Sequence, residues 1–203
     1  MEHIETVPIC SNALFIYKLN IKNDLTLRFK KEKFRPAKIT NSETDKFMCL
    51  VGEDFNALNK YKELNKEIKK AVDQTLKEVL MFENIDYRIF SSWITKTSPH
   101  SFSAQHSHSN SWLSGVYYPK FNPSFGIKFY HDSISQFFTQ PKKYNIYNSS
   151  DWTVIPEENY LILFFSQLRH QIMPNLSSED RYSLAFNIIP KGKFGAGGAT
   201  IKF

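Results

Sequence analysis

The stretch RYSLAFNII, residues 181–189, alternates two kinds of side chain, as a strand does when one of its faces covers a core. The apolar face consists of Tyr182, Leu184, Phe186 and Ile188. The other face carries a guanidinium, a hydroxyl and an amide, from Arg181, Ser183 and Asn187. It is either a solvated surface or the wall of a carboxylate-binding pocket, because arginine offers a planar pair of donors that matches a carboxylate.

Segments with the same period of two fill the chain from residue 87 onward, and turn-rich pieces such as KFNPS and YNSSD join them. The predicted strands are 87–96, 112–118, 125–130, 152–155, 161–165 and 181–189. Many short strands without helices between them indicate antiparallel sheets in a sandwich, barrel or jelly roll. The aromatic content of 15% agrees with this, because rings fill such cores well.

The N-terminal part has a different pattern. Residues 13–29 are rich in β-branched and aromatic side chains and predict two strands, or a hairpin that turns near Asn23 and Asp24, and a polar loop follows over 30–46. Residues 54–81 predict one long helix with Asp54 as its N-cap. Its apolar residues recur every three or four positions, at Leu58, Tyr61, Leu64, Ile68, Val72, Leu76 and Val79. We expect this stripe to pack against a sheet.

The size and composition predict one domain of 203 residues in three parts. These are N-terminal strands and a helix over 1–85, a β-core over 86–190, and a tail over 191–203 whose GKFGAGGAT is expected to be flexible or tightly turned. No apolar run is long enough for a membrane span, and the N-terminus does not resemble a secretory signal. Cys10 and Cys49 lack CxxC spacing and favour a reducing compartment, so we expect a cytoplasmic protein.

The formal net charge of +6 is consistent with a nucleic-acid partner, another anionic ligand, or a lysine-rich surface. The lysines are scattered through the chain, which favours the surface interpretation and gives nucleic acid only weak support. The sequence does not indicate an oligomeric state.

The histidines are the strongest sign of chemistry. In the segment SAQHSHSNSWLSGVYYP, residues 103–119, His106 and His108 lie two positions apart. On extended backbone their side chains share one face, about 7 Å apart, which suits two imidazoles that bind one metal. An HxH pair alone is weak evidence, since polar loops also contain it by chance. His170 strengthens it, because it directly follows the apolar strand in YLILFFSQLRH.

Three phrases, in this order, resemble the Fe(II)/2-oxoglutarate-dependent oxygenases, and most closely the small members found in phages and marine bacteria. They are QHSHSNSWLSGVYY at 105–118, LFFSQLRHQIMPN at 163–175 and DRYSLAFN at 180–187. The resemblance covers roughly residues 90–190 and leaves the first 85 unassigned. It implies a double-stranded β-helix, or jelly roll, with the N-terminal helix packed on it. A phage protein would act in the host cytoplasm.

The resemblance also implies roles for particular residues. His106 and His170 would bind Fe(II), and Arg181 would bind the far carboxylate of 2-oxoglutarate, aided by Ser183 and Tyr118. Asn187 would be a nearby supporting or substrate contact. The reaction would hydroxylate a small-molecule or peptidyl substrate and release succinate and CO₂.

One position departs from the family pattern of two histidines and one carboxylate. His108 occupies the carboxylate position, and we expect it to be the third ligand, because neutral imidazole also binds Fe(II). Asp132 is the alternative source of a carboxylate. Two rival functions remain open: a cupin-like metalloprotein that does not use 2-oxoglutarate, and a non-catalytic binding module on the same fold.

Overall fold

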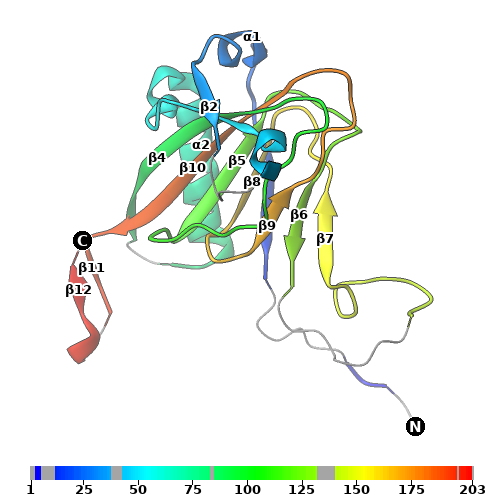
Figure 1. The fold of residues 1–203 in the computed structure, drawn as a ribbon. Coiled ribbons are helices and arrows are strands. Elements are labelled where there is room, and N and C mark those ends of the chain that lie inside the picture. Colours follow the sequence, from blue (N-terminus) through cyan, green and yellow to red (C-terminus); the bar gives the residue numbers. More distant parts are fainter. Residues whose placement is uncertain are drawn as a thin grey trace.

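The computed structural model describes residues 3–5, 12–37, 43–82, 85–131, 140–195 and 197–202. Among these residues, seven antiparallel strands form the larger sheet (Figure 1). Their order is β1 (Leu14–Lys18), β8 (Tyr160–Phe165), β5 (Leu113–Tyr118), β10 (Arg181–Lys191), β4 (Asp86–Thr97), β3 (Leu50–Gly52) and β2 (Phe34–Pro36). A smaller sheet contains β7 (Asp151–Val154), β6 (Ile127–Tyr130) and β9 (His170–Ile172).

The larger sheet is buried on both faces, because its central strands carry apolar residues at successive positions. In β5, Tyr117 packs in the core cluster on the helix side, while Val116 and Tyr118 pack with the smaller sheet. In β8, Leu161 and Ile162 divide between the two clusters in the same way. The strands therefore have two apolar faces, one for each neighbouring layer.

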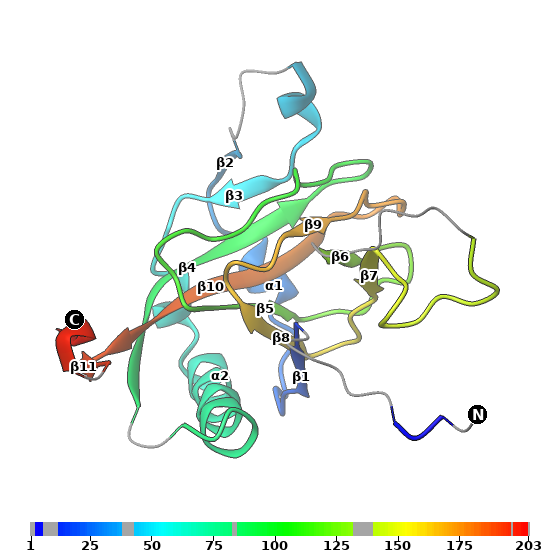
Figure 2. The ribbon, with the colours of Figure 1, turned by 90° about the horizontal axis from the view of Figure 1, so that it is seen from below.

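Helix α2 (Lys62–Gln74) covers the face opposite the smaller sheet (Figure 2). It continues into a π-helical turn at Thr75–Val79, and its buried residues include Leu64, Ile68, Val72 and Leu76. A shorter helix, α1 (Thr26–Phe29), buries Phe29 in the same cluster. Within the described part of the chain, no helix combines the length and apolar character that a membrane crossing requires.

The fold confirms the mainly antiparallel β prediction, and each of the six predicted strands matches an observed one to within about two residues. The predicted helix over 54–81 is wrong in its extent. Ala57–Lys60 form a 3₁₀ turn, and the helix begins at Lys62. Asp54 is not its N-cap; its carboxylate instead accepts the backbone N–H of Asn56.

Two further predictions need correction. Residues 19–25 form no second strand and 26–29 form α1, because Asp24 accepts the N–H of Thr26 and turns the chain there. The predicted loop over 30–46 contains β2, an edge strand. In the tail, β11 (Lys193–Phe194) pairs with β12 (Ile201–Lys202). The division of the chain into three parts remains a prediction.

Candidate metal and co-substrate site

His106 and His170 are brought together by the backbone itself. The N–H of each residue donates to the carbonyl of the other, at 2.9 Å in both directions. Two residues that exchange both hydrogen bonds of an antiparallel bridge project their side chains to the same face. Their rings lie with centroids 4.4 Å apart, although 63 residues separate them in the sequence.

His108 completes the group from the same segment. Its N–H donates to the Ser166 carbonyl at 2.9 Å, and its Nε2 lies 3.3 Å from Nε2 of His170. A candidate ligand atom from each of the three imidazoles lies within 4.8 Å of the others. Two imidazole nitrogens bound to one metal at about 2.1 Å and at right angles would be about 3 Å apart, so the three rings need little rearrangement to share an ion.

Hydrogen bonds orient two of the imidazoles. Nδ1 of His106 lies 2.8 Å from the Ala104 carbonyl, and Nδ1 of His170 lies 2.9 Å from the Leu168 carbonyl. A carbonyl can only accept, so each Nδ1 carries the proton and Nε2 keeps a lone pair for a metal. This is the usual way in which a protein fixes a histidine ligand.

Burial keeps all three imidazoles neutral. It lowers the pKa of His108 to about 4 and that of His170 to about 3, and proximity to His106 adds to both shifts. The pKa of His106 is also lowered by burial. Neutral imidazoles need not lose a proton to bind a cation at neutral pH.

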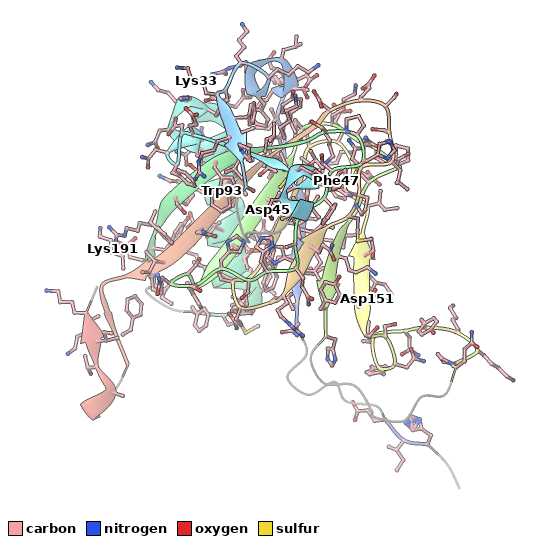
Figure 3. All side chains as sticks on the ribbon, viewed as in Figure 1. Lys33, Asp45, Phe47, Trp93, Asp151 and Lys191 are labelled. Atoms are coloured by element: carbon pink, nitrogen blue, oxygen red, sulfur yellow. The ribbon has the colours of Figure 1, made fainter. Side chains whose placement is uncertain are left out.

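The three histidines line a cavity of about 310 Å³ between the two sheets. Tyr118 and Ser183 also line it, together with Trp93 and Thr95 from β4. Trp93 lies on the same side of the molecule as Asp45 and Phe47 (Figure 3). Its ring centroid is 5.8 Å from that of His108, so the indole forms the wall beside this histidine.

Arg181 is 5% exposed, and its guanidinium lies over the Phe125 ring. Nη2 donates to the Thr97 hydroxyl at 3.2 Å, while Nε and Nη1 have no hydrogen-bond partner among the described residues. The hydroxyl of Tyr118 is buried and interacts with this guanidinium. The arginine pKa is lowered to about 10 by burial, with Tyr118 opposing the shift, so the group stays cationic at neutral pH. A buried guanidinium with donors that the described residues do not use is suited to bind an anion.

The structure therefore brings together His106, His108, His170, Tyr118 and Ser183 around one cavity, with Arg181 beside Tyr118. It does not place Asn187 on the cavity wall. The Asn187 side chain accepts a hydrogen bond from Ser114, which in turn bonds Ser166. Because Ser166 holds the backbone of His108, Asn187 lies behind the histidine segment. Asp132 lies outside the described residues.

Sequence reasoning missed the residues that β2, β3 and β4 contribute to the cavity, among them Arg35, Val51, Trp93 and Thr95. The alternation in YRIFSSWITK could have placed Trp93 and Thr95 on one face of their strand. It could not show that this strand pairs with β10 and that this face therefore lies beside Ser183. Arg35 gave no signal, because its segment was interpreted as a loop.

The sequence profile of the family described as "Putative 2OG-Fe(II) oxygenase" matches residues 91–187, which span the histidines, Arg181 and the strands that hold them. The β-core therefore resembles that of the 2OG-Fe(II) oxygenases. The predicted cofactor and co-substrate, Fe(II) and 2-oxoglutarate, are those of this family, and the histidine triad is suited to the metal. A search of curated proteins by sequence finds no match.

Solved structures of 2OG-dependent oxygenases share the fold. A prolyl hydroxylase from Trichoplax adhaerens, in complex with a fragment of the hypoxia inducible factor oxygen degradation domain, has 10% identity and a TM-score of 0.60, covering 87% of this chain and 83% of its own. HygX from Streptomyces hygroscopicus, with nickel, 2-oxoglutarate and hygromycin B bound, has 8% identity and a TM-score of 0.59, covering 88% and 83%.

A 2OG-Fe(II) oxygenase family oxidoreductase from Burkholderia pseudomallei has 12% identity and a TM-score of 0.52, covering 78% of this chain and 72% of its own. At such identities these likenesses concern the fold alone. They are consistent with the predicted double-stranded β-helix.

Proposed function

We propose that this chain is an Fe(II)- and 2-oxoglutarate-dependent oxygenase that hydroxylates a C–H bond. The reaction consumes dioxygen and 2-oxoglutarate. One oxygen atom enters the hydroxylated product, the other enters succinate, and succinate leaves together with CO₂. The observation that carries the proposal is the closeness of two features, one that lines the cavity and one that adjoins its wall at Tyr118. Three neutral imidazoles converge within 4.8 Å, and a buried guanidinium beside Tyr118 lacks an anion.

His106, His108 and His170 are the proposed metal ligands. Together they would occupy one face of the ion and leave three positions for the co-substrate and dioxygen, as in the family pattern of two histidines and one carboxylate. Bound Fe(II) supplies the redox chemistry that couples oxidation of 2-oxoglutarate to oxidation of the substrate. The Nδ1 bonds to backbone carbonyls hold the rings of His106 and His170 in place for this role.

Arg181 is the proposed partner of the far carboxylate of 2-oxoglutarate. Nε and Nη1 have no partner among the described residues, and Nη2 keeps one N–H beyond the bond to Thr97. Nη2 together with Nε or Nη1 therefore offers a carboxylate two donors side by side, and the Tyr118 hydroxyl can add a third hydrogen bond. Ser183, one step along the same face of β10, also lines the cavity. Apolar walls, including Ile127, Phe164 and Ile172, would exclude water from the bound co-substrate.

The proposed substrate is a peptidyl or small organic molecule. The neighbouring structures include one with a peptide fragment and one with hygromycin B, so this fold accommodates both kinds of ligand. Of the rival functions, a metalloprotein without 2-oxoglutarate leaves the free donors of Arg181 without a purpose, and therefore accounts for the site less well.

Succinate formation tests the proposal. The purified chain with Fe(II), 2-oxoglutarate and air should form succinate, slowly even without its substrate. His170→Ala and Arg181→Met should each lower the rate about 100-fold, because each removes a strong charge-assisted or metal bond. Arg88→Met is the matched control, since Arg88 does not line the cavity among the described residues. A wild-type rate no higher than that of Fe(II) in buffer would contradict the proposal and favour the binding module.

A further inference from the structure

The cavity has a second cationic residue at its outer end. Among the described residues that line the cavity, Arg35 is the only arginine or lysine, and none is Asp or Glu. No described carboxylate lies within ion-pair distance of Arg35. The proposed contacts with Fe(II) and 2-oxoglutarate do not involve this residue.

A row of paired residues connects Arg35 to the proposed co-substrate site. Arg35 pairs with Val51, Val51 pairs with Thr95, and Thr95 pairs with Ser183, across β2, β3, β4 and β10. All four side chains line the cavity. Adjacent strands lie about 4.8 Å apart, so the Arg35 backbone is about 14 Å from that of Ser183. This is too far for Arg35 to share the carboxylate bound by Arg181, and it leaves room for another molecule between them.

Aromatic rings hold the Arg35 guanidinium at the mouth. Its Cζ lies 5.7 Å from the centroid of the Phe55 ring, and the Phe55 ring lies 6.2 Å from that of Trp93. The Trp93 ring in turn lies 5.8 Å from His108. The wall therefore runs from an exposed cation, across two aromatic rings, to a proposed metal ligand. Phe55 is 43% exposed, so its ring is available for contact with a ligand.

The charge of the loaded site also favours an anion. With three neutral imidazoles, the charges of Fe(II) and of dianionic 2-oxoglutarate cancel, and Arg181 and Arg35 leave two positive charges at the cavity. A carboxylate at the position of His108 would have removed one of them. Positive potential in a cavity with low-dielectric walls attracts and orients anionic ligands.

We propose that the substrate carries an anionic group, a carboxylate or phosphate, which Arg35 binds, on an apolar body that packs against Phe55 and Trp93. This inference rests on the proposed function and names the class of substrate for that site. Arg35 is a specificity-determining residue in this account, because it fixes the anionic end at the mouth and directs the body of the molecule toward the histidines.

Three ring compounds of similar size test this: 3-phenylpropionate, phenyl phosphate and the neutral 3-phenylpropanamide. Each is titrated calorimetrically, without oxygen, into the full chain loaded with Fe(II) and saturated with 2-oxoglutarate, so that Arg181 is already engaged. At low ionic strength we expect at least one anion to bind about tenfold more tightly than the amide. The preference should shrink with added salt, because Arg35 is exposed. The preferred anion identifies the acid in the substrate.

Arg35→Met should remove the preference and leave the affinity for the amide within about twofold. Arg35→Lys should retain part of it, since the charge stays but the planar fork is lost. Arg88→Met, with the same change in net charge, should leave the preference intact. Phe55→Ala should weaken all three probes, since the ring would contact each of them.

Equal affinity for the anions and the amide, an unchanged preference in Arg35→Met, or binding of none of the probes would overturn the inference. The affinity for 2-oxoglutarate is measured on the same preparations. If the wild type binds 2-oxoglutarate but shows no anion preference, only this inference fails. If the wild type does not bind 2-oxoglutarate, the proposed function fails. If Arg35→Met loses 2-oxoglutarate binding, Arg35 contacts the co-substrate and the inference is wrong.

Discussion

Arg181 illustrates how a single residue can be costly for the fold and necessary for the site. A buried charge without a partner destabilises a protein, and an apolar side chain of similar length often restores stability. Arg181→Met should therefore leave the metal-free protein as stable as the wild type or more stable by about 1–3 kcal/mol. The same substitution should weaken 2-oxoglutarate binding about 100-fold. Denaturant unfolding and calorimetry measure the two effects.

If Arg181 serves to bind 2-oxoglutarate, Arg181→Met should not lower the stability of the metal-free protein but should lower its affinity for 2-oxoglutarate. If Arg181→Met strongly destabilised the metal-free protein, the guanidinium would have a structural role through Thr97 and Phe125 instead. In the wild type, 2-oxoglutarate with the metal should raise the melting temperature, because ligands that bind only the folded state stabilise it. In Arg181→Met this increase should be nearly absent.

The sequence predicted most of the candidate site at the residue level. The period of two in 181–189 placed Arg181 and Ser183 on one face, and in the structure Ser183 lines the cavity while Arg181 lies beside Tyr118, which also lines it. Asn187 shares the period, but the ladder with β4 shifts register between Asn187 and Ile188, and its side chain bonds Ser114. Local periodicity cannot reveal a β-bulge, so this position was the least predictable.

At the scale of elements, β5 depends on a residue without a side chain. A Cβ added at Gly115 would lie 2.7 Å from Cδ2 of Leu163 and would also collide with the Phe186 ring. Both neighbours are fully buried, so neither can move freely. Gly115→Ala should lower the free energy of unfolding by about 1–3 kcal/mol, as overpacking does. Urea titration measures this change.

Gly198→Ala provides the comparison for Gly115. A Cβ there has no described atom within 4 Å, so its effect should stay within about 0.5 kcal/mol. If both alanine variants were equally stable, the close packing of β5 against β8 and β10 would be wrong. A loss of 2-oxoglutarate affinity in Gly115→Ala would be a secondary effect, because Gly115 and Phe186 also line the cavity.

The boundaries of the helix were less predictable than the strands, for a physical reason. Leu58 and Tyr61 continue the apolar spacing of α2, and both are buried in the same cluster. They reach it from a 3₁₀ turn in which the Leu58 N–H donates to the Ser92 hydroxyl on β4. The spacing of apolar residues predicts which side chains are buried. It does not predict whether their backbone N–H groups form helical hydrogen bonds. Tertiary contacts determined the start of the helix.

For the whole molecule, the three buried imidazoles link stability to pH. The pKa values of His108 and His170 lie near 4 and 3 in the folded state, below the ordinary value of 6.5. Between these values the unfolded chain binds more protons, so the metal-free protein should lose stability as pH falls below 6.5. Each such imidazole contributes up to about 1.4 kcal/mol per pH unit.

A pH series of urea titrations on the metal-free protein measures this slope. His170→Gln should make the slope shallower between pH 6.5 and 4, because one titrating group is removed. Stability that stays level across this window in the wild type would show that the imidazoles are solvated and do not form a buried site.

The arrangement of the sheet is what the sequence could least predict. Arg35, Thr95 and Ser183 come from three distant segments, and the strand order alone places them in one row. Nothing local in the chain specifies that β2 and β3 extend the sheet beyond β4. Residue types, spacing and the family resemblance together predicted that the histidines and Arg181 belong to one site, whereas the mouth of the cavity required the structure.

The central claim is that one cavity binds a metal through three histidines and 2-oxoglutarate through Arg181. Anaerobic calorimetric titration of 2-oxoglutarate tests it most directly, with the wild-type chain before and after Fe(II) is removed by a chelator, and with Arg181→Met. We expect one molecule of 2-oxoglutarate to bind per chain, and we expect this binding to require both Fe(II) and Arg181. Absence of binding to the Fe(II)-loaded wild type, or equal binding with and without the metal, would contradict it.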